Sequence, residues 1–271
     1  MMFRNLMLVT CIAAQLCGNA QEAFTDTSFW QEYHDAYFVG DTDSVNAVRS
    51  IAVDDHSNIF IATAGGAFVK RQNAREWIPL LPNEESGPAY AVAKDNAGNI
   101  WISTWKSLFF YSGNHLQKIE GIEAPISVLC VAAEGMYAIG PDGIWVIADN
   151  KPRRLEYVLP ASVRNAVSDG KGGIWIASDA GLYHASKSGS KKYTATNGLL
   201  SAALKDACFD DQNNIWAGGL GGINILAGEK VSRKITPAEG CPSIFVNAIE
   251  RSVDGTMWVG TRTGVVRYYP N

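Results

Sequence analysis

Basic side chains recur at one position of a repeating pattern along this sequence. Arg49, Arg164 and Lys205 each lie five residues before an aspartate that opens a turn, and Tyr90 and Asn247 occupy the matching place in two further copies. Cations that share a repeat position would gather around one centre. There they would attract an anionic ligand such as a uronate, a carboxylate or a phosphate, and arginine would hold it through two parallel hydrogen bonds.

The same cations also have a structural interpretation, in which each pairs with an acid of a neighbouring loop and joins two repeats. The acids that would serve are Asp41, Asp43, Glu84, Glu85 and Asp206. For a single cation such pairing is the more common arrangement, so an anion site depends on several cations acting together.

A second set of candidate contacts lies four residues after a recurring aromatic residue. The residues at this position are Ala64, Trp105, Pro141, Asp179, Leu220 and Arg262. Trp105, which precedes Lys106, would offer a flat apolar face on which a sugar ring or another flat ligand stacks. The alternative is that its ring packs on its own loop. Arg262 joins the ligand-binding candidates as a further cation.

Catalytic and metal-binding patterns are weak. The chain has no Gly-x-Ser-x-Gly motif and no cysteine next to a base. Asn165 and Asp206 share a repeat position and would begin an oxygen-ligand metal site, but no further acid completes the set. The four histidines are scattered: His34, His56, His115 and His184. We therefore expect neither a metal nor a cofactor, and we expect His184 to be a packing residue.

The composition is that of an acidic globular protein. The chain has 271 residues, 47% of them hydrophobic, and its 23 lysines and arginines are outnumbered by 27 aspartates and glutamates. Binding to the phosphates of nucleic acid needs a basic excess, so nucleic acid is not an expected partner. After the first twenty residues no apolar run is long enough to span a membrane, so no membrane span is expected.

Residues 1–20 have the pattern of a signal peptide. Arg4 supplies the positive start, residues 6–16 the apolar run, and Gly-Asn-Ala at 18–20 the small residues before a cleavage site. We expect residues 21–271 to form a single exported domain, periplasmic or secreted. The cysteines that remain, expected to be free thiols, are Cys130, Cys208 and Cys241.

A repeat accounts for the positions of all these side chains. Segments such as Asn-Ile-Trp-Ile recur six times around an aromatic anchor, at Phe60, Trp101, Tyr137, Trp175, Trp216 and Trp258. Successive anchors are 36 to 42 residues apart, at or just below the roughly 40 to 45 residues of a four-stranded propeller blade. The sequence therefore predicts an all-β fold, a six-bladed β-propeller with four strands in each blade.

Each copy is expected to contain four strands. In the first copy these are an inner strand over 48–53, an anchor strand through Phe60, a third strand from Ala67 after a glycine turn, and an outer strand over 77–80. Outer strands of later copies are expected over 191–196 and 231–236. The anchors should be core residues, together with Trp145 and Tyr183.

The two ends of the chain are expected to close the ring. The last copy ends at Asn271 without an outer strand, and an aromatic segment, Phe29–Tyr33, precedes the first inner strand. We expect this N-terminal segment to complete the last blade, which would leave only short, protected sheet edges.

Three segments carry a family resemblance: Tyr-Thr-Ala-Thr-Asn-Gly-Leu at 193–199, Asp210 to Trp216, and Met-Trp-Val-Gly-Thr-Arg-Thr-Gly-Val at 257–265. They resemble two-component regulator propeller repeats, a resemblance that covers nearly all of residues 21–271. It implies a bacterial periplasmic or surface sensor module, a type often fused to a membrane-spanning kinase. No kinase region or membrane span is present in this sequence, so a stand-alone exported propeller is expected.

We therefore expect a propeller that binds a carbohydrate, a small anionic ligand or an envelope protein on its loop face, rather than a catalyst. The candidate contacts are Trp105, Arg49, Arg164, Lys205 and Arg262. The alternative is an enzyme with its site at the central channel, either a carbohydrate lyase or hydrolase or a metal-dependent lactonase-like enzyme.

Overall fold

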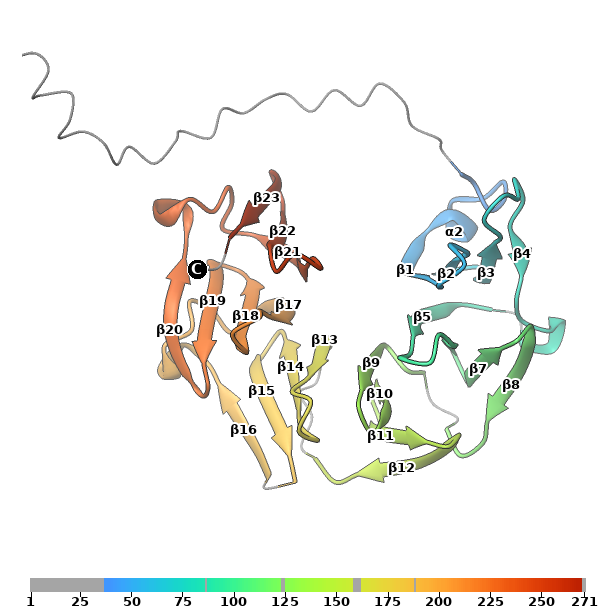
Figure 1. Ribbon diagram of the computed structural model, residues 1–271, viewed down its shortest axis with the longest axis horizontal. Coiled ribbons are helices and arrows are strands. Elements are labelled where there is room, and N and C mark those ends of the chain that lie inside the picture. The colour runs from blue at the N-terminus through green and yellow to red at the C-terminus, as the bar shows by residue number, and fades with distance from the viewer. Residues whose placement is uncertain (1–36, 86, 123–124, 158–161, 188, 270–271) are drawn as a thin grey trace, which may run out of the picture. The chain divides into compact units, whose positions relative to one another are not determined.

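Antiparallel strands that follow one another in chain order build this protein. The structure is a computed structural model that describes residues 37–85, 87–122, 125–157, 162–187 and 189–269. Within these residues there are five four-stranded sheets and one three-stranded sheet, and in each the strands pair in the order in which they occur. Figure 1 shows the six sheets in succession, and we call each of them a blade.

The first three blades lie between residues 48 and 155. Blade 1 contains β1 (Val48–Val53), β2 (Ile59–Thr63), β3 (Gly66–Lys70) and β4 (Ile78–Pro79). Blade 2 contains β5 (Ala89–Lys94), β6 (Ile100–Thr104), β7 (Leu108–Ser112) and β8 (His115–Ile119). Blade 3 contains β9 (Val128–Ala132), β10 (Gly135–Gly140), β11 (Gly143–Ala148) and β12 (Lys151–Leu155).

The other three blades lie between residues 163 and 268. Blade 4 contains β13 (Val163–Ser168), β14 (Ile174–Ser178), β15 (Gly181–Ser186) and β16 (Gly189–Tyr193). Blade 5 contains β17 (Leu204–Phe209), β18 (Asn214–Gly219), β19 (Gly222–Ala227) and β20 (Lys230–Ile235). Blade 6 contains β21 (Val246–Arg251), β22 (Met257–Thr261) and β23 (Gly264–Tyr268).

Helical segments are short and lie in the connections. Within the described residues they are α2 (Asp43–Asn46) and three 3₁₀ turns, η1 (Asn83–Glu85), η2 (Ala195–Asn197) and η3 (Pro237–Glu239). Thr194 caps η2 and Thr236 caps η3, and each turn ends at a glycine in the left-handed region. No helix within the described residues is both long enough and apolar enough to cross a membrane.

The predicted all-β propeller fold is confirmed, and the strand bounds agree closely with expectation. The expected inner strand over 48–53 is β1, and the outer strands expected over 191–196 and 231–236 are shifted toward the N-terminus, as β16 and β20. Glycine opens the third strand where the expected turn requires a positive φ, which is 144° at Gly66 and 135° at Gly181.

The core lies between neighbouring blades. Trp101 of β6 packs with Met136 and Trp145 of blade 3, and Trp216 of β18 packs with Met257 and Val259 of blade 6. The anchor of one blade therefore packs against the strands of the next blade. Five of the six expected anchors are buried, and Trp216 is only 3% exposed. Tyr183 is partly buried against the core of blades 3 and 4.

The prediction that Trp258 is a core residue is wrong. Its side chain is 42% exposed, although it occupies the anchor position of β22 and pairs with Glu250 and Arg267 as the other anchors pair with their neighbours. The physical reason is that an anchor is covered by the following blade, and blade 6 is the last one described. Ile51 of β1, on the first blade, is likewise 62% exposed.

The expected closing strand, Phe29–Tyr33, lies outside the described residues, as does the expected signal peptide over residues 1–20. Blade 6 has three strands within the described residues. Closure of the ring by the N-terminal segment therefore stays a prediction.

Candidate functional site

The basic residues of the repeat lie at β-bulges. In five of the six inner strands described, the register slips by one residue at the same place, and the extra residues are Arg49, Tyr90, Arg164, Lys205 and Asn247. A bulge interrupts the ladder and re-aims a side chain away from the regular alternation of the strand. Strand β9 of blade 3 pairs with β10 without a slip. The sequence identified the shared position, and the structure shows that this position is a β-bulge.

The bulges bring Arg49 and Arg164 to one cavity. This cavity has a volume of about 180 Å³ and is lined by residues of β1, β5, β9 and β13, among them Arg49, Tyr90 and Arg164. Ser127 and Asn165 also line it. Two arginines, one from blade 1 and one from blade 4, therefore line the same space, as an anion site requires.

Arg49 has neutral partners. Its Nη1 donates to the carbonyl oxygen of Ala89 over 3.2 Å, and its guanidinium carbon lies 4.9 Å from the centre of the Tyr90 ring. Neither partner carries a negative charge. Within the described part of the chain, Arg49 forms no ion pair with the acids expected for it, Asp41, Asp43, Glu84 or Glu85.

Arg164 and Lys205 share one acid. Nε of Arg164 lies 3.0 Å from Oδ1 of Asp179, Nη2 contacts Oδ2, and Nζ of Lys205 lies 3.4 Å from Oδ1. Ser162 donates to the same carboxylate over 2.7 Å. The hydrogen bonds from Arg164 and Ser162 hold the pKa of Asp179 well below its usual value. The structural interpretation therefore holds in full for Lys205, whose ion pair joins blades 5 and 4, whereas Arg164 pairs with an acid of its own blade. The acid is Asp179, which is not among those expected.

The second set of candidates lies at the same ends of the strands. In four blades, the backbone N–H of this turn residue donates to the carbonyl oxygen two residues before the bulge position of the same blade. The bonds run from Ala64 to Ala47, from Trp105 to Pro88, from Leu220 to Ala203 and from Arg262 to Phe245. The turns and the bulges therefore form one surface, which we call the bulge face.

Trp105 and Arg262 lie on the bulge face but outside the cavity of Arg49. Trp105 is 46% exposed, and Nζ of Lys106 lies 5.2 Å from its ring centre. The ring sits against Gly87, where a Cβ atom would come within 2.6 Å of Nε1. Arg262 lies over the ring of Phe245 at 5.3 Å.

Asn165 and Asp206, the incomplete start of an oxygen-ligand metal site, have another role. Nδ2 of Asn165 donates to Oδ1 of Asp206, and Oδ2 of Asp206 accepts from the backbone N–H of Ile249 over 2.6 Å. These bonds link blades 4, 5 and 6. Burial raises the pKa of Asp206 despite these donors. Among the described residues, no group of three or more histidine, cysteine, aspartate or glutamate side chains is arranged to hold a metal ion.

His184 packs as expected. Its ring stacks on Trp175 with the ring centres 4.4 Å apart, and Nε2 lies 3.1 Å from Oδ2 of Asp169. The contacts tie the anchor of blade 4 to the turn between β13 and β14. They lie at the opposite ends of the strands from the bulge face.

Comparisons with known proteins agree with this architecture. Residues 83–106 match the family model described as two component regulator propeller. No curated protein sequence matches the chain significantly. Many solved structures resemble it, all of those quoted below at low sequence identity, so that they show the fold alone.

Three of these structures come from different kinds of protein. The WD40 β-propeller domain of Doa1 has a TM-score of 0.62 at 14% identity, with 81% of this chain and 77% of that chain covered. Virginiamycin B lyase from Staphylococcus aureus has a TM-score of 0.62 at 12% identity, covering 83% and 85%. The extracellular domain of the putative hybrid two component system BT4673 from B. thetaiotaomicron has a TM-score of 0.52 at 12% identity, covering 88% and 40%.

Proposed function

We propose that this chain is an exported β-propeller that binds a small anionic ligand, such as a uronate or another carboxylate, on its bulge face without transforming it. The observation that carries the proposal is the cavity into which bulges bring Arg49 and Arg164. One blade alone would make neither the cavity nor the pair of cations.

The charges around the cavity favour an anion. Arg49, Arg164 and Lys205 bring three positive charges to the bulge face, and Asp179 pairs with two of them. A positive excess therefore remains at Arg49, whose contacts are to neutral groups. A carboxylate would gain charge-assisted hydrogen bonds from a guanidinium whose planar fork matches its two oxygen atoms.

Trp105 lies outside this cavity on the same face, and its exposed ring supports a carbohydrate that extends beyond the anionic group. An aromatic face on a rim next to a cation suits a sugar ring that carries an acid group. The same exposed ring would also suit a protein partner. Export is supported by the signal-peptide pattern of residues 1–20 and by the fold shared with extracellular domains of two-component systems.

Calorimetric titration of residues 21–271 with galacturonate, and with glucose as the neutral counterpart, tests the proposal. We expect galacturonate to bind more tightly than glucose, and Arg49→Gln and Arg164→Gln to weaken it by about tenfold each. Arg233→Gln, on the exposed outer strand β20, is the matched control and should leave binding unchanged.

Three results would contradict the proposal. Equal binding of the two sugars would remove the role of charge, and unchanged binding by both cavity variants would place the ligand elsewhere. Release of a product from galacturonate during the titration would show that the protein is a catalyst.

A further inference from the structure

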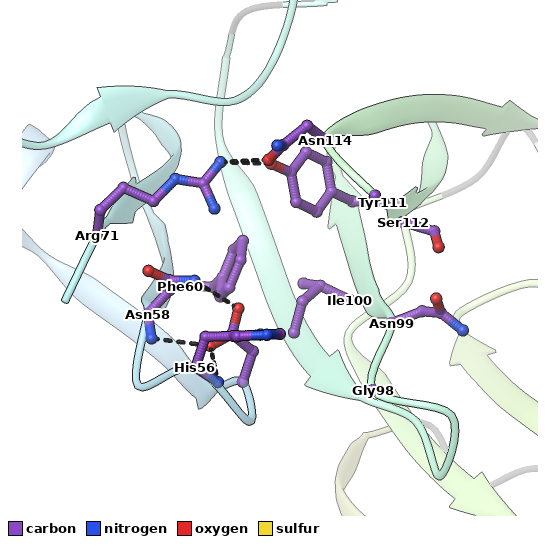
Figure 2. A pocket seen from close by; sticks show the side chains of 12 residues that line it. His56, Asn58, Phe60, Arg71, Gly98, Asn99, Ile100, Tyr111, Ser112 and Asn114 are labelled. Carbon is purple, nitrogen blue, oxygen red and sulfur yellow. Dashed lines mark hydrogen bonds between the residues drawn. The ribbon is translucent and has the colours of Figure 1, made fainter.

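A second cavity opens between blades 1 and 2, at the strand ends opposite to the bulge face. Its volume is about 380 Å³, within the range of small-molecule sites in proteins. It is formed where the β1–β2, β3–β4, β5–β6 and β7–β8 turns approach one another, so both blades contribute to it. Figure 2 shows the side chains that line it.

The floor of this cavity is apolar. Phe60 of β2 and Ile100 of β6 are buried, and the Tyr111 ring of β7 lies 5.7 Å from the Phe60 ring, measured between centres. In Figure 2 the Phe60 ring lies between two polar ends, one with Arg71, Asn114 and the Tyr111 hydroxyl, and the other with His56 and Asn58. A flat apolar ring of a ligand would find contacts on this floor.

Arg71 brings a positive charge to one end. Its Nη2 donates to the hydroxyl of Tyr111 and to Oδ1 of Asn114, both over 2.7 Å, and the Tyr111 hydroxyl donates to the same Oδ1 over 2.8 Å. Both acceptors are neutral. Among the described residues these bonds use one guanidinium nitrogen, which leaves Nε and Nη1 of Arg71 and Nδ2 of Asn114 as donors for a ligand.

The acid that lines the cavity does not neutralise Arg71. The carboxylate of Asp54 accepts from the backbone N–H groups of His56 and Asn58, over 2.9 and 2.8 Å, and from Nδ2 of Asn58 over 2.7 Å. Burial acts to raise the pKa of Asp54, but these bonds hold it below its usual value. Asp54 therefore stabilises the β1–β2 turn, at the end of the cavity away from Arg71.

We propose that this cavity binds a small monocarboxylate that carries a flat apolar ring. The carboxylate lies at Nε and Nη1 of Arg71 and Nδ2 of Asn114, and the ring lies on Phe60, Ile100 and Tyr111. The site needs a ligand with one charged end and one apolar end because Arg71, whose partners among the described residues are neutral, lies beside an apolar floor.

Benzoate is the probe, titrated into the full chain with detection by NMR of the aromatic resonances. Benzamide has the same shape without the charge, and acetate has the charge without the ring. We expect benzoate to bind at least about tenfold more tightly than either. Arg71→Gln should weaken benzoate by about tenfold, while Arg71→Lys, which keeps the charge, should weaken it less.

Two matched controls accompany these variants. Arg75→Gln changes an exposed arginine of the same β3–β4 connection and should leave binding unchanged. Arg49→Gln, on the bulge face, should also leave benzoate binding unchanged, so the two proposed sites can fail independently.

Arg71 also joins blades 1 and 2 through its bonds to Tyr111 and Asn114. A loss of benzoate binding in Arg71→Gln therefore has to be distinguished from a loss of structure. Asn114→Asp replaces the Nδ2 donor by an acceptor but keeps the Oδ1 acceptor of Arg71 and Tyr111, and aspartate tolerates the backbone φ of 67°. This variant decides the question if Arg71→Gln does not fold, and it should weaken benzoate about tenfold.

The proposal is overturned if benzoate does not bind, if benzamide binds equally well, or if folded Arg71→Gln lowers the melting temperature but retains benzoate affinity. The last result would show that Arg71 only holds the blades together. Loss of benzoate binding in Arg49→Gln, with Arg71→Gln unaffected, would place the probe on the bulge face instead.

Discussion

Nε1 of Trp216 donates a hydrogen bond to Oδ2 of Asp210 over 2.9 Å. The same carboxylate accepts from the backbone N–H groups of Gln212 and Asn214, so one aspartate orders the turn between β17 and β18 and fixes the anchor that follows. Trp101 makes the same bond to Asp95 over 3.0 Å. The recurring aspartate and tryptophan are thus two parts of one structural device.

Blade 1 contains a natural control for this device. Its turn aspartate, Asp54, accepts the same bonds from its turn, but its anchor is Phe60, which has no N–H group to donate. We expect Asp210→Ala to lower the free energy of unfolding by about 1 to 3 kcal/mol more than Asp54→Ala, because only the former leaves a buried indole N–H unpaired. Urea denaturation measures the difference, and equal losses would show that the indole bond contributes nothing.

The exposure of Trp258 leads to a second comparison. Trp216→Ala should lower the free energy of unfolding by about 3 to 5 kcal/mol, because it empties a buried site between blades 5 and 6. Trp258→Ala removes a side chain that is 42% exposed and should cost about 1 to 2 kcal/mol. Thermal and urea unfolding of both variants check this. A loss as large as that of Trp216→Ala would show that another face covers Trp258, as ring closure requires.

A third prediction concerns pH. Burial acts to raise the pKa of Asp169, but the N–H groups of Lys171 and Gly173, together with His184, lower it below its usual value of 3.8. A carboxylate with a lowered pKa in the folded state stabilises the protein above pH 3.8, and this contribution disappears as the pH falls through the lowered value.

Asp169→Asn should therefore lose less stability between about pH 7 and about pH 3 than the unchanged protein does. The urea midpoint at both pH values is the measurement, with Asp149→Asn at an exposed turn as the control. The prediction fails if Asp169→Asn and the unchanged protein have the same pH dependence.

Local spacing explains how much of the fold can be predicted. Anchors 36 to 42 residues apart, with glycine and aspartate turns at constant offsets, are sufficient to place β1 at its observed bounds, since each strand forms with neighbours in its own copy. The burial of Trp258 was predicted incorrectly because alignment of repeats assumes equal surroundings for every copy. An end blade has one neighbour fewer among the described residues.

The site was predicted less completely because its contacts cross between blades. Spacing placed Arg49 and Arg164 at one position, and the bulges bring them to one cavity. Asp179 as the shared partner of Arg164 and Lys205 was missed, although it belongs to the turn set that lies on the same face. Pairing the two position sets, rather than treating each alone, would have identified it.

The last prediction concerns the placement of Trp105. Gly87 has a φ of +142°, and a Cβ atom there would come within 2.6 Å of Nε1 of Trp105. Gly87→Ala should therefore displace the indole and, with the backbone strain, lower the free energy of unfolding by about 1 to 3 kcal/mol. In a Trp105→Ala background the same change should cost less, because only the strain remains. Denaturation of the four proteins, with fluorescence as the readout of the indole, gives the coupling between the two positions. A coupling of zero would mean that Gly87 does not position Trp105, and the ring would then be free to adopt other orientations on the bulge face.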